Sequence, residues 1–195
     1  GPDADTLEAY SLFRADPRAG RIAFATGMQV SSLLRRARIL SQSWREAEDT
    51  LTEKRARLMA TPTIYPTTGY VSSVFTSSRW HPSLDRPRPH TGIDIVAPRG
   101  TPVVASAHGR VQSVGYQGEY GLLIEIDHGY GLLTRYAHLS RAAVKVGQSV
   151  QRGDTIGNVG QSGLATGPHL HYEVLVNGAP ANPRRFILDT RVVPD

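Results

Sequence analysis

The sequence predicts an α+β protein that is mainly β, with one long amphipathic helix ahead of a compact β domain. Two patterns support this prediction. Apolar residues recur at helical spacing between about residues 22 and 60. After residue 66 the chain changes to short apolar runs separated by Gly, Pro and Asn, as all-β regions do. With 195 residues, 39% hydrophobic and 20% charged, the composition is that of a globular protein, and no apolar run is long enough to predict a membrane span.

The N-terminal segment, residues 1–21, opens with Gly1-Pro2, a pair typical of what a site-specific protease leaves after tag removal. No secretory signal pattern follows. The formal net charge is +5 and the pI is near 9.8. This balance suits an anionic partner such as nucleic acid, anionic lipid or cell-wall polymer, or only a solvated basic surface. The chain has no cysteine, so His, Asp and Glu are left for any metal.

A long amphipathic helix is predicted over residues 22–61. Steps of three and four join its apolar positions, which are Val30, Leu33, Ala37, Leu40, Trp44, Ala47, Leu51 and Leu58. Lys54 interrupts this stripe, and Thr61-Pro62 ends the helix because proline has no amide donor. About 35 residues make a rod of roughly 50 Å, longer than the roughly 35 Å width of the remaining domain. The stripe therefore either packs on its own domain and residues 1–20, or forms a coiled coil or helical hairpin with an upstream segment or a second copy.

Residues 62–195 are predicted to form the β domain. The expected strands cover residues 102–107, 110–116, 121–128, 131–137, 155–159 and 170–176. Residues 128–131 are expected to form a hairpin turn, and so is Val176-Asn-Gly-Ala, since Asn-Gly favours a type I′ turn. The stretch 78–89 has the composition of a loop.

His90 and Asp94 form the first candidate pair, in His90-Thr-Gly-Ile-Asp94. Gly92, β-branched neighbours and Pro98 favour an extended segment, where even spacing puts both side chains on one face. Gly92 lies between them, so no side chain blocks access to a shared object. Imidazole and carboxylate groups are good ligands for a metal of the zinc type, although polar residues in a surface turn show the same pattern.

His169 and His171 have the same relation at a spacing of two, with Leu170 directed to the opposite, core face. Alone, this pair also fits an ordinary surface strand. Together, the two pairs offer the donors for a three-ligand site with one open position, which is how catalytic zinc is held. His138, after the predicted strand 131–137, is a further candidate base.

The other histidines and the glycine-rich stretch are not predicted to bind the metal. His108 and His128 lie at predicted turns, where exposed structural positions are expected, and His81 lies in the predicted loop before His90. The stretch 157–167 is rich in glycine but lacks the Lys-Ser/Thr of a phosphate-binding loop, so we interpret it as a loop that borders a groove. No His-Glu-x-x-His is present, which excludes the common helical zinc-protease motif.

Four motifs in order resemble the lysostaphin-type, or LytM-like, zinc endopeptidases. They are His90-x-x-x-Asp94, Ala97-Pro-x-Gly-Thr-Pro-Val103, Tyr136-Ala-His-Leu-Ser140 and Gly167-Pro-His-Leu-His-Tyr-Glu173. The resemblance covers roughly residues 65–187. It implies a compact antiparallel β catalytic domain with a groove, and an enzyme that cuts peptide bonds in bacterial peptidoglycan.

The resemblance also implies roles for single residues. His90, Asp94 and His171 are expected to bind one Zn²⁺ per chain, and His138 and His169 to act as the catalytic pair. It further implies cell-wall remodelling in the periplasm or cell envelope, with the full-length protein anchored to the membrane. The long helix ahead of the domain resembles D,D-endopeptidases that cut cross-links between D-Ala and diaminopimelate more than bacteriocins that cut glycine bridges, and cleavage of glycine bridges stays open as the alternative.

Some members of the family have lost ligands and act as activators that bind other wall hydrolases. This alternative loses support because all five positions are present. The expected partners are therefore a peptidoglycan peptide and, through the helix, a second copy or another protein. Nucleic acid is not expected, because the chain lacks interleaved aromatic platforms.

Overall fold

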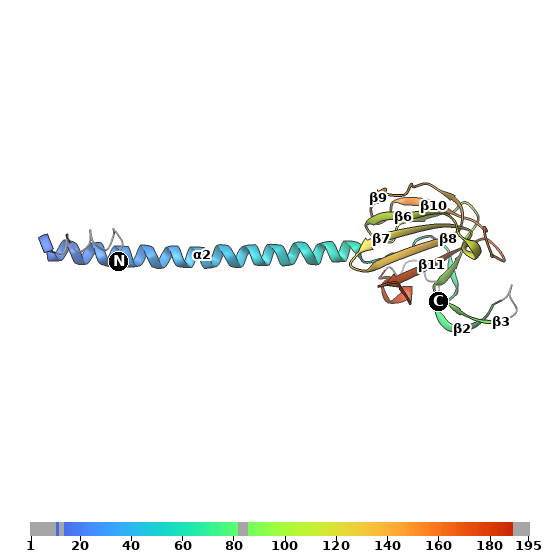
Figure 1. Ribbon diagram of the computed structural model, residues 1–195, viewed down its shortest axis with the longest axis horizontal. Coiled ribbons are helices and arrows are strands. Elements are labelled where there is room, and N and C mark those ends of the chain that lie inside the picture. The colour runs from blue at the N-terminus through green and yellow to red at the C-terminus, as the bar shows by residue number, and fades with distance from the viewer. Residues whose placement is uncertain (1–10, 12–13, 82–85, 189–195) are drawn as a thin grey trace. The chain divides into compact units, whose positions relative to one another are not determined.

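The computed structural model describes residue 11 and residues 14–81 and 86–188 (Figure 1). Most of the predicted N-terminal segment 1–21 lies outside them. The chain divides into two compact units, residues 1–54 and residues 55–195, which are described separately. The described elements are α2 (Pro17–Ala60), β1 (Tyr70–Ser73), β2 (Thr76–His81), β3 (Arg86–His90), β4 (Ile93–Val96), β5 (Pro102–Val104), β6 (Gly109–Tyr116), η1 (Gly118–Tyr120), β7 (Leu122–Gly129), β8 (Leu132–Ala142), β9 (Ser149–Val150), β10 (Thr155–Val159), β11 (His169–Val176), β12 (Ala179–Ala181) and η2 (Pro183–Arg185).

Helix α2 runs from Pro17 to Ala60, where the apolar periodicity indicated residues 22–61. It begins earlier because Asp16 caps it: the Asp16 carboxylate accepts hydrogen bonds from the backbone amides of Arg18 (2.8 Å) and Ala19 (3.3 Å). Pro17 follows at the first helical position, where its missing amide costs nothing. At 1.5 Å per residue, the helix is about 66 Å long.

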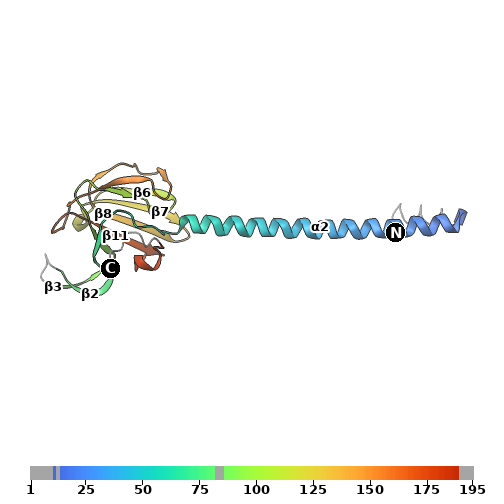
Figure 2. The same ribbon diagram turned by 180° about the vertical axis from the view of Figure 1, so that it is seen from behind.

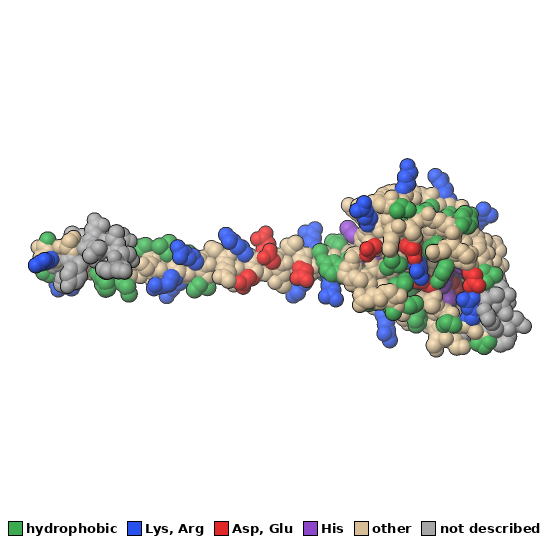
Figure 3. All heavy atoms as spheres, in the orientation of Figure 1, with side chains coloured by type: hydrophobic (Ala, Val, Ile, Leu, Met, Phe, Trp, Pro, Cys, Tyr) green, Lys and Arg blue, Asp and Glu red, His purple; other side chains and the backbone are tan. Residues whose placement is uncertain are grey.

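The apolar stripe of α2 lies open to solvent in this structure. The side chains of Leu33, Leu40 and Trp44 are 62%, 60% and 75% exposed. Apolar, basic and acidic side chains follow one another along the visible face of the helix in Figure 3. No described helix combines the length and apolar character needed to span a bilayer.

An antiparallel sheet forms the second unit, as expected. Its strands follow the order β1-β4-β11-β8-β7-β6-β9, while β10 pairs with β5 and β8, and β12 pairs with β11. The long strands β6, β7, β8 and β11 lie side by side in both views (Figures 1 and 2). The core contains fully buried residues from several of these strands, among them Ile93, Ile95, Ile124, Ile126, Leu139, Leu170 and Val174.

The predicted hairpin turns are confirmed. Asn177 and Gly178 have φ values of 50° and 81°, and Tyr130 and Gly131 have 53° and 73°. Two consecutive positive φ values are the signature of a type I′ turn, whose twist matches that of the flanking strands.

The prediction of a loop over residues 78–89 is wrong for residues 78–81 and 86–89, and its remaining residues lie outside the described part of the chain. β2 and β3 pair there as a two-stranded antiparallel sheet, with Arg79 opposite Arg88 and Trp80 opposite Pro87. Pro87 and Pro89 suggested a loop because proline cannot donate to a ladder. In a two-stranded sheet, however, both strands are edges, and edge strands tolerate proline. Strand β3 carries His90 at its end.

Candidate metal centre

Neighbouring strands bring the two predicted pairs together. On β4, Asp94 lies between Ile93 and Ile95, which are fully buried on the opposite face. On β11, His171 lies directly opposite Asp94 in the antiparallel ladder. His90 joins them from the end of β3.

Gly92 has a role that was not predicted, in the packing of the strands. A Cβ atom on it would lie 2.3 Å from the backbone oxygen of Tyr172. Only glycine therefore allows the segment between His90 and Asp94 to approach β11 this closely.

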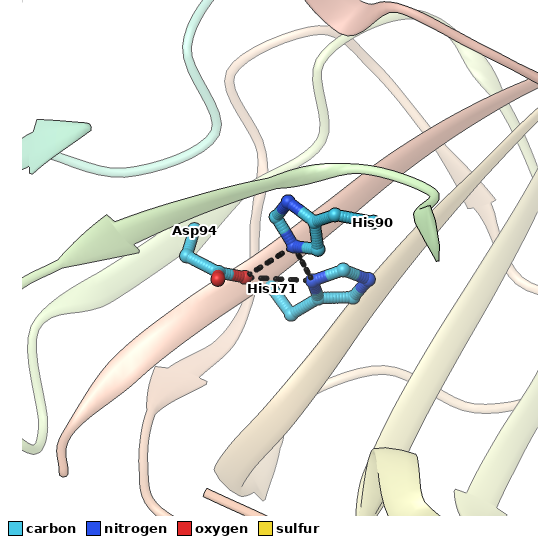
Figure 4. Close-up of side chains that lie close together, drawn as sticks. All are labelled: His90, Asp94 and His171. Carbon is cyan, nitrogen blue, oxygen red and sulfur yellow. Dashed lines mark hydrogen bonds and ion pairs between the residues drawn. The ribbon is translucent and has the colours of Figure 1, made fainter. Parts of the chain in front are cut away.

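Three ligand atoms converge at this point (Figure 4). Asp94 Oδ1 lies 3.0 Å from His90 Nε2 and 2.7 Å from His171 Nδ1, and the two nitrogens are 3.2 Å apart. All three side chains are buried, and their ligand atoms lie within 4.8 Å of one another. Two imidazole nitrogens and one carboxylate oxygen form a donor set that suits Zn²⁺.

The second nitrogen of each imidazole fixes which nitrogen faces the centre. His90 Nδ1 donates to the backbone oxygen of Val74 (2.8 Å), and His171 Nε2 donates to Glu173 Oε1 (3.1 Å). In the neutral rings, His90 Nε2 and His171 Nδ1 then direct lone pairs toward the Asp94 carboxylate. Lone pairs that face one another repel unless a cation lies between them. The arrangement therefore requires a proton or a metal ion.

The pKa values agree with this geometry. Burial opposes a charge on His171, but its hydrogen bonds to Asp94 and Glu173 outweigh burial and raise the pKa of His171 to about 9. Burial likewise opposes ionisation of Asp94, but hydrogen bonds from His171 and His90 hold the pKa of Asp94 well below its usual range. Without a metal, a proton on His171 supplies the cation at neutral pH.

Glu173, behind His171, is a residue for which no role was predicted. It is fully buried, and besides His171 it accepts hydrogen bonds from Thr91 Oγ1, Tyr120 Oη (3.1 Å) and Arg135 Nη1 (3.3 Å). A carboxylate behind a ligand histidine fixes the tautomer and makes the ligand more basic. The alternation that links residues 169 and 171 extends to residue 173, so this signal was present in the sequence.

His138 and His169 lie beside the three ligand atoms. Their ring centroids are 4.7 Å apart, and the ring of His138 is 5.9 Å from that of His171. His138 Nδ1 donates to the backbone oxygen of Ser162, and His169 Nδ1 donates to that of Gly167, both at 2.8 Å. Each neutral ring therefore keeps an unprotonated Nε2.

A strained backbone sets the position of His138. Its φ is 59°, a left-handed conformation that side chains other than glycine rarely adopt. The register of β8 against β7 changes here, since Tyr136 pairs with Ile124 but Leu139 pairs with Leu122. Such a bulge redirects a side chain. Burial lowers the pKa of His138 to about 4, although the Ser162 carbonyl opposes the shift.

The five predicted site residues line one cavity of about 430 Å³. Leu164, Thr166 and Gly167 also line it, so part of the glycine-rich stretch borders the site as expected. The prediction of an exposed His128 is wrong. It is buried, where its nitrogens contact the backbone oxygen of His108 (2.7 Å) and Thr134 Oγ1 (2.8 Å). The His81 side chain lies outside the described part of the structure.

Comparisons with known proteins show to which family the chain belongs. The family model described as Peptidase family M23 matches residues 88–183. The catalytic domain of the prophage-encoded M23 protein EnpA from Enterococcus faecalis is 35% identical and superposes with a TM-score of 0.54, over 62% of this chain and 95% of that one. The chain belongs to peptidase family M23. This finding confirms the resemblance to the lysostaphin-type enzymes.

Two curated relatives are similar to part of this chain. The DD-carboxypeptidase/endopeptidase Mpg of Neisseria meningitidis is 49% identical over 120 residues, which are 62% of this chain and 27% of Mpg. The peptidoglycan DD-endopeptidase ShyC of Vibrio cholerae is 46% identical over 114 residues, which are 58% of this chain and 26% of ShyC. The matched part is thus about a quarter of each relative.

Proposed function

We propose that this M23 domain is a zinc-dependent endopeptidase that hydrolyses peptide bonds in bacterial peptidoglycan during cell-wall remodelling. As its substrate we propose the cross-link between D-Ala and diaminopimelate. The observation that carries the proposal is the group of His90, Asp94 and His171, whose ligand atoms lie within 4.8 Å of one another in the wall of a cavity. The names of Mpg and ShyC support the substrate class.

The proposed zinc ligands are His90 Nε2, Asp94 Oδ1 and His171 Nδ1, for one ion per chain. When bound, Zn²⁺ lowers the pKa of a coordinated water to about 7 and polarises a carbonyl oxygen. Val74 and Glu173 hold the two imidazoles in the tautomers that such binding needs. Three protein ligands leave a coordination position open, as catalytic rather than structural zinc sites do.

His138 and His169 are the proposed catalytic residues. In each, a backbone carbonyl holds the proton on Nδ1, so Nε2 can accept a proton from the attacking water. The protonated ring can then steady the oxyanion or pass the proton to the leaving amine. Burial favours a neutral His138, which keeps it ready to accept a proton at neutral pH.

The proposal extends to the organisation of the chain. We divide it into an N-terminal segment, predicted over residues 1–21, a long helix, predicted over residues 22–61 and extending from Pro17 to Ala60 as α2, and the M23 domain (62–195). The exposed apolar stripe of the helix supports a coiled-coil contact with a second copy or with another protein. Because peptidoglycan lies outside the cytoplasmic membrane, we place the protein in the periplasm or cell envelope, with the full-length protein anchored to the membrane.

Digestion of purified peptidoglycan tests the proposal. The zinc-loaded protein is expected to convert cross-linked muropeptides into monomers that mass spectrometry detects, whereas a His138→Ala variant with equal zinc content is expected to release few or none. No new muropeptide from the zinc-loaded protein would overturn the proposal.

A further inference from the structure

One ion pair lies in the wall of the proposed active-site cavity. Arg88 Nη1 donates to Glu119 Oε2 at 2.8 Å, with side chains that are 36% and 57% exposed. The pair joins β3 to η1, and both residues line the cavity. Exposed ion pairs of this kind contribute little to folding stability, so stability does not explain why this pair is present in the cavity wall.

The pair is close to the proposed reaction centre. Arg88 precedes His90 by two residues on β3, which places both on the same face of the strand, about 7 Å apart along it. Glu119 precedes Tyr120, whose ring lies 5.9 Å from that of His171 and whose hydroxyl donates to Glu173. A residue of an extended peptide substrate spans about 3.3 Å, as a residue of the strand does. A substrate whose scissile bond is held at the three ligand atoms therefore passes Arg88 within two of its own residues from that bond.

Arg88 can bind a second anion while it keeps Glu119. Among the described residues that line the cavity, it is the one Arg or Lys side chain. A guanidinium has five N–H donors in a planar fork, and Glu119 contacts it through Nη1. The other edge of the fork is suited to a carboxylate of the substrate.

The proposed substrate carries a carboxylate within this distance of the scissile bond. In the cross-link, the amide nitrogen after the scissile bond belongs to the D-centre of diaminopimelate, and the same carbon bears a free carboxylate. We propose that Arg88, oriented by Glu119, binds this carboxylate and thereby selects cross-links that end in an unamidated diaminopimelate. Glycine bridges and amidated diaminopimelate offer no negative charge there. This inference rests on the proposed endopeptidase function.

The test compares two synthetic tetrapeptide dimers that differ in one group. The diaminopimelate after the scissile bond carries either its free carboxylate or a carboxamide, and kcat/KM is measured for both with the zinc-loaded full chain. A charged hydrogen bond of this kind predicts a preference of about tenfold or more for the carboxylate. Arg88→Gln is expected to reduce this ratio to near one, while Arg88→Lys retains part of it because the charge remains.

Arg141→Gln is the matched control. It removes the same charge from an exposed residue that does not line the cavity, and the ratio is expected to stay at the wild-type value. Equal cleavage of both dimers by the wild type, or an unchanged ratio in Arg88→Gln, would overturn the role of Arg88 and leave the endopeptidase function intact. Cleavage of neither dimer would overturn both.

Discussion

The two histidines of β11 are separated by a single residue but are predicted to respond very differently to substitution. His171 Nδ1 is 2.7 Å from Asp94 Oδ1 and belongs to the ligand group, whereas His169 Nε2 is 3.9 Å from the same oxygen and does not. His171→Ala removes a proposed ligand, while His169→Ala removes a proposed acid–base group. We therefore expect the first variant to lose zinc and the second to lose turnover.

The size of the difference follows from the ligand count. Protein sites with four zinc ligands bind with about 10–16 kcal/mol, so one ligand contributes about 3 kcal/mol, or roughly 100-fold to 1000-fold in Kd. His171→Ala is expected to weaken zinc binding by that factor. His169 Nε2 lies 3.9 Å from Asp94 Oδ1, too far for a hydrogen bond. His169→Ala is therefore expected to weaken zinc binding by less than the roughly tenfold that loss of a residue bonded to a ligand costs. Replacement of His171 still leaves Glu173 bound to Thr91, Tyr120 and Arg135, so the fold is expected to persist.

Competition with a chromophoric zinc chelator gives the Kd of each variant, and thermal unfolding of the zinc-free proteins controls for folding. Equal loss of zinc affinity in the two variants would refute the division of roles. So would a greater loss in His169→Ala.

Three further predictions concern the surroundings of the ligands. Glu173→Gln keeps the shape but removes the charge behind His171, and is expected to weaken zinc binding by about 10-fold to 100-fold in the same chelator assay, where an unchanged Kd would contradict the role. Because the pKa of His171 is about 9 in the metal-free protein, zinc binding at pH 7 must displace its proton. The affinity for zinc should therefore fall about tenfold per pH unit as the pH falls below 9, and binding at pH 7 should release about one proton. Calorimetry in buffers of different ionisation enthalpy measures this release, and a value near zero would contradict the prediction. Gly92→Ala places a Cβ 2.3 Å from the Tyr172 oxygen and is expected to lower the free energy of unfolding, measured by chemical denaturation, by about 3 kcal/mol. At Gly115 a Cβ would meet no atom within 4 Å apart from those of the adjacent residues, so Gly115→Ala should cost less than about 1 kcal/mol, and similar costs for the two variants would refute the steric account.

Local sequence patterns predicted the parts of this structure that depend on local physics. The apolar stripe indicated the helix, and Asn177-Gly178 indicated a turn whose φ values are those expected. Alternation along β11 placed His169 and His171 on the face opposite the buried Leu170. Each of these features is decided within a few residues of the chain.

Features that depend on the order of the strands in the sheet could not be predicted from the local sequence. Pairing of β4 with β11 brings Asp94 opposite His171, 77 residues away. The two same-face pairs and the motif resemblance suggested a shared site, but neither indicated which strands pair. The close backbone contact at Gly92 has the same origin. His128 is buried beside the backbone oxygen of His108 and the hydroxyl of Thr134, and its turn-like local sequence does not reveal these contacts. Register, crossovers and bulges are tertiary properties, so composition alone does not determine them.

Hydrolysis of a defined cross-linked dimer in water enriched in heavy oxygen tests the central claim most directly. The zinc-loaded protein is expected to release two monomers. The monomer with the new D-Ala carboxylate should carry one heavy oxygen, and the monomer with the newly freed diaminopimelate amine should carry none. Removal of zinc with a chelator should stop the reaction, and added zinc should restore it. Cleavage at another bond, or equal cleavage by the zinc-free protein, would contradict the account.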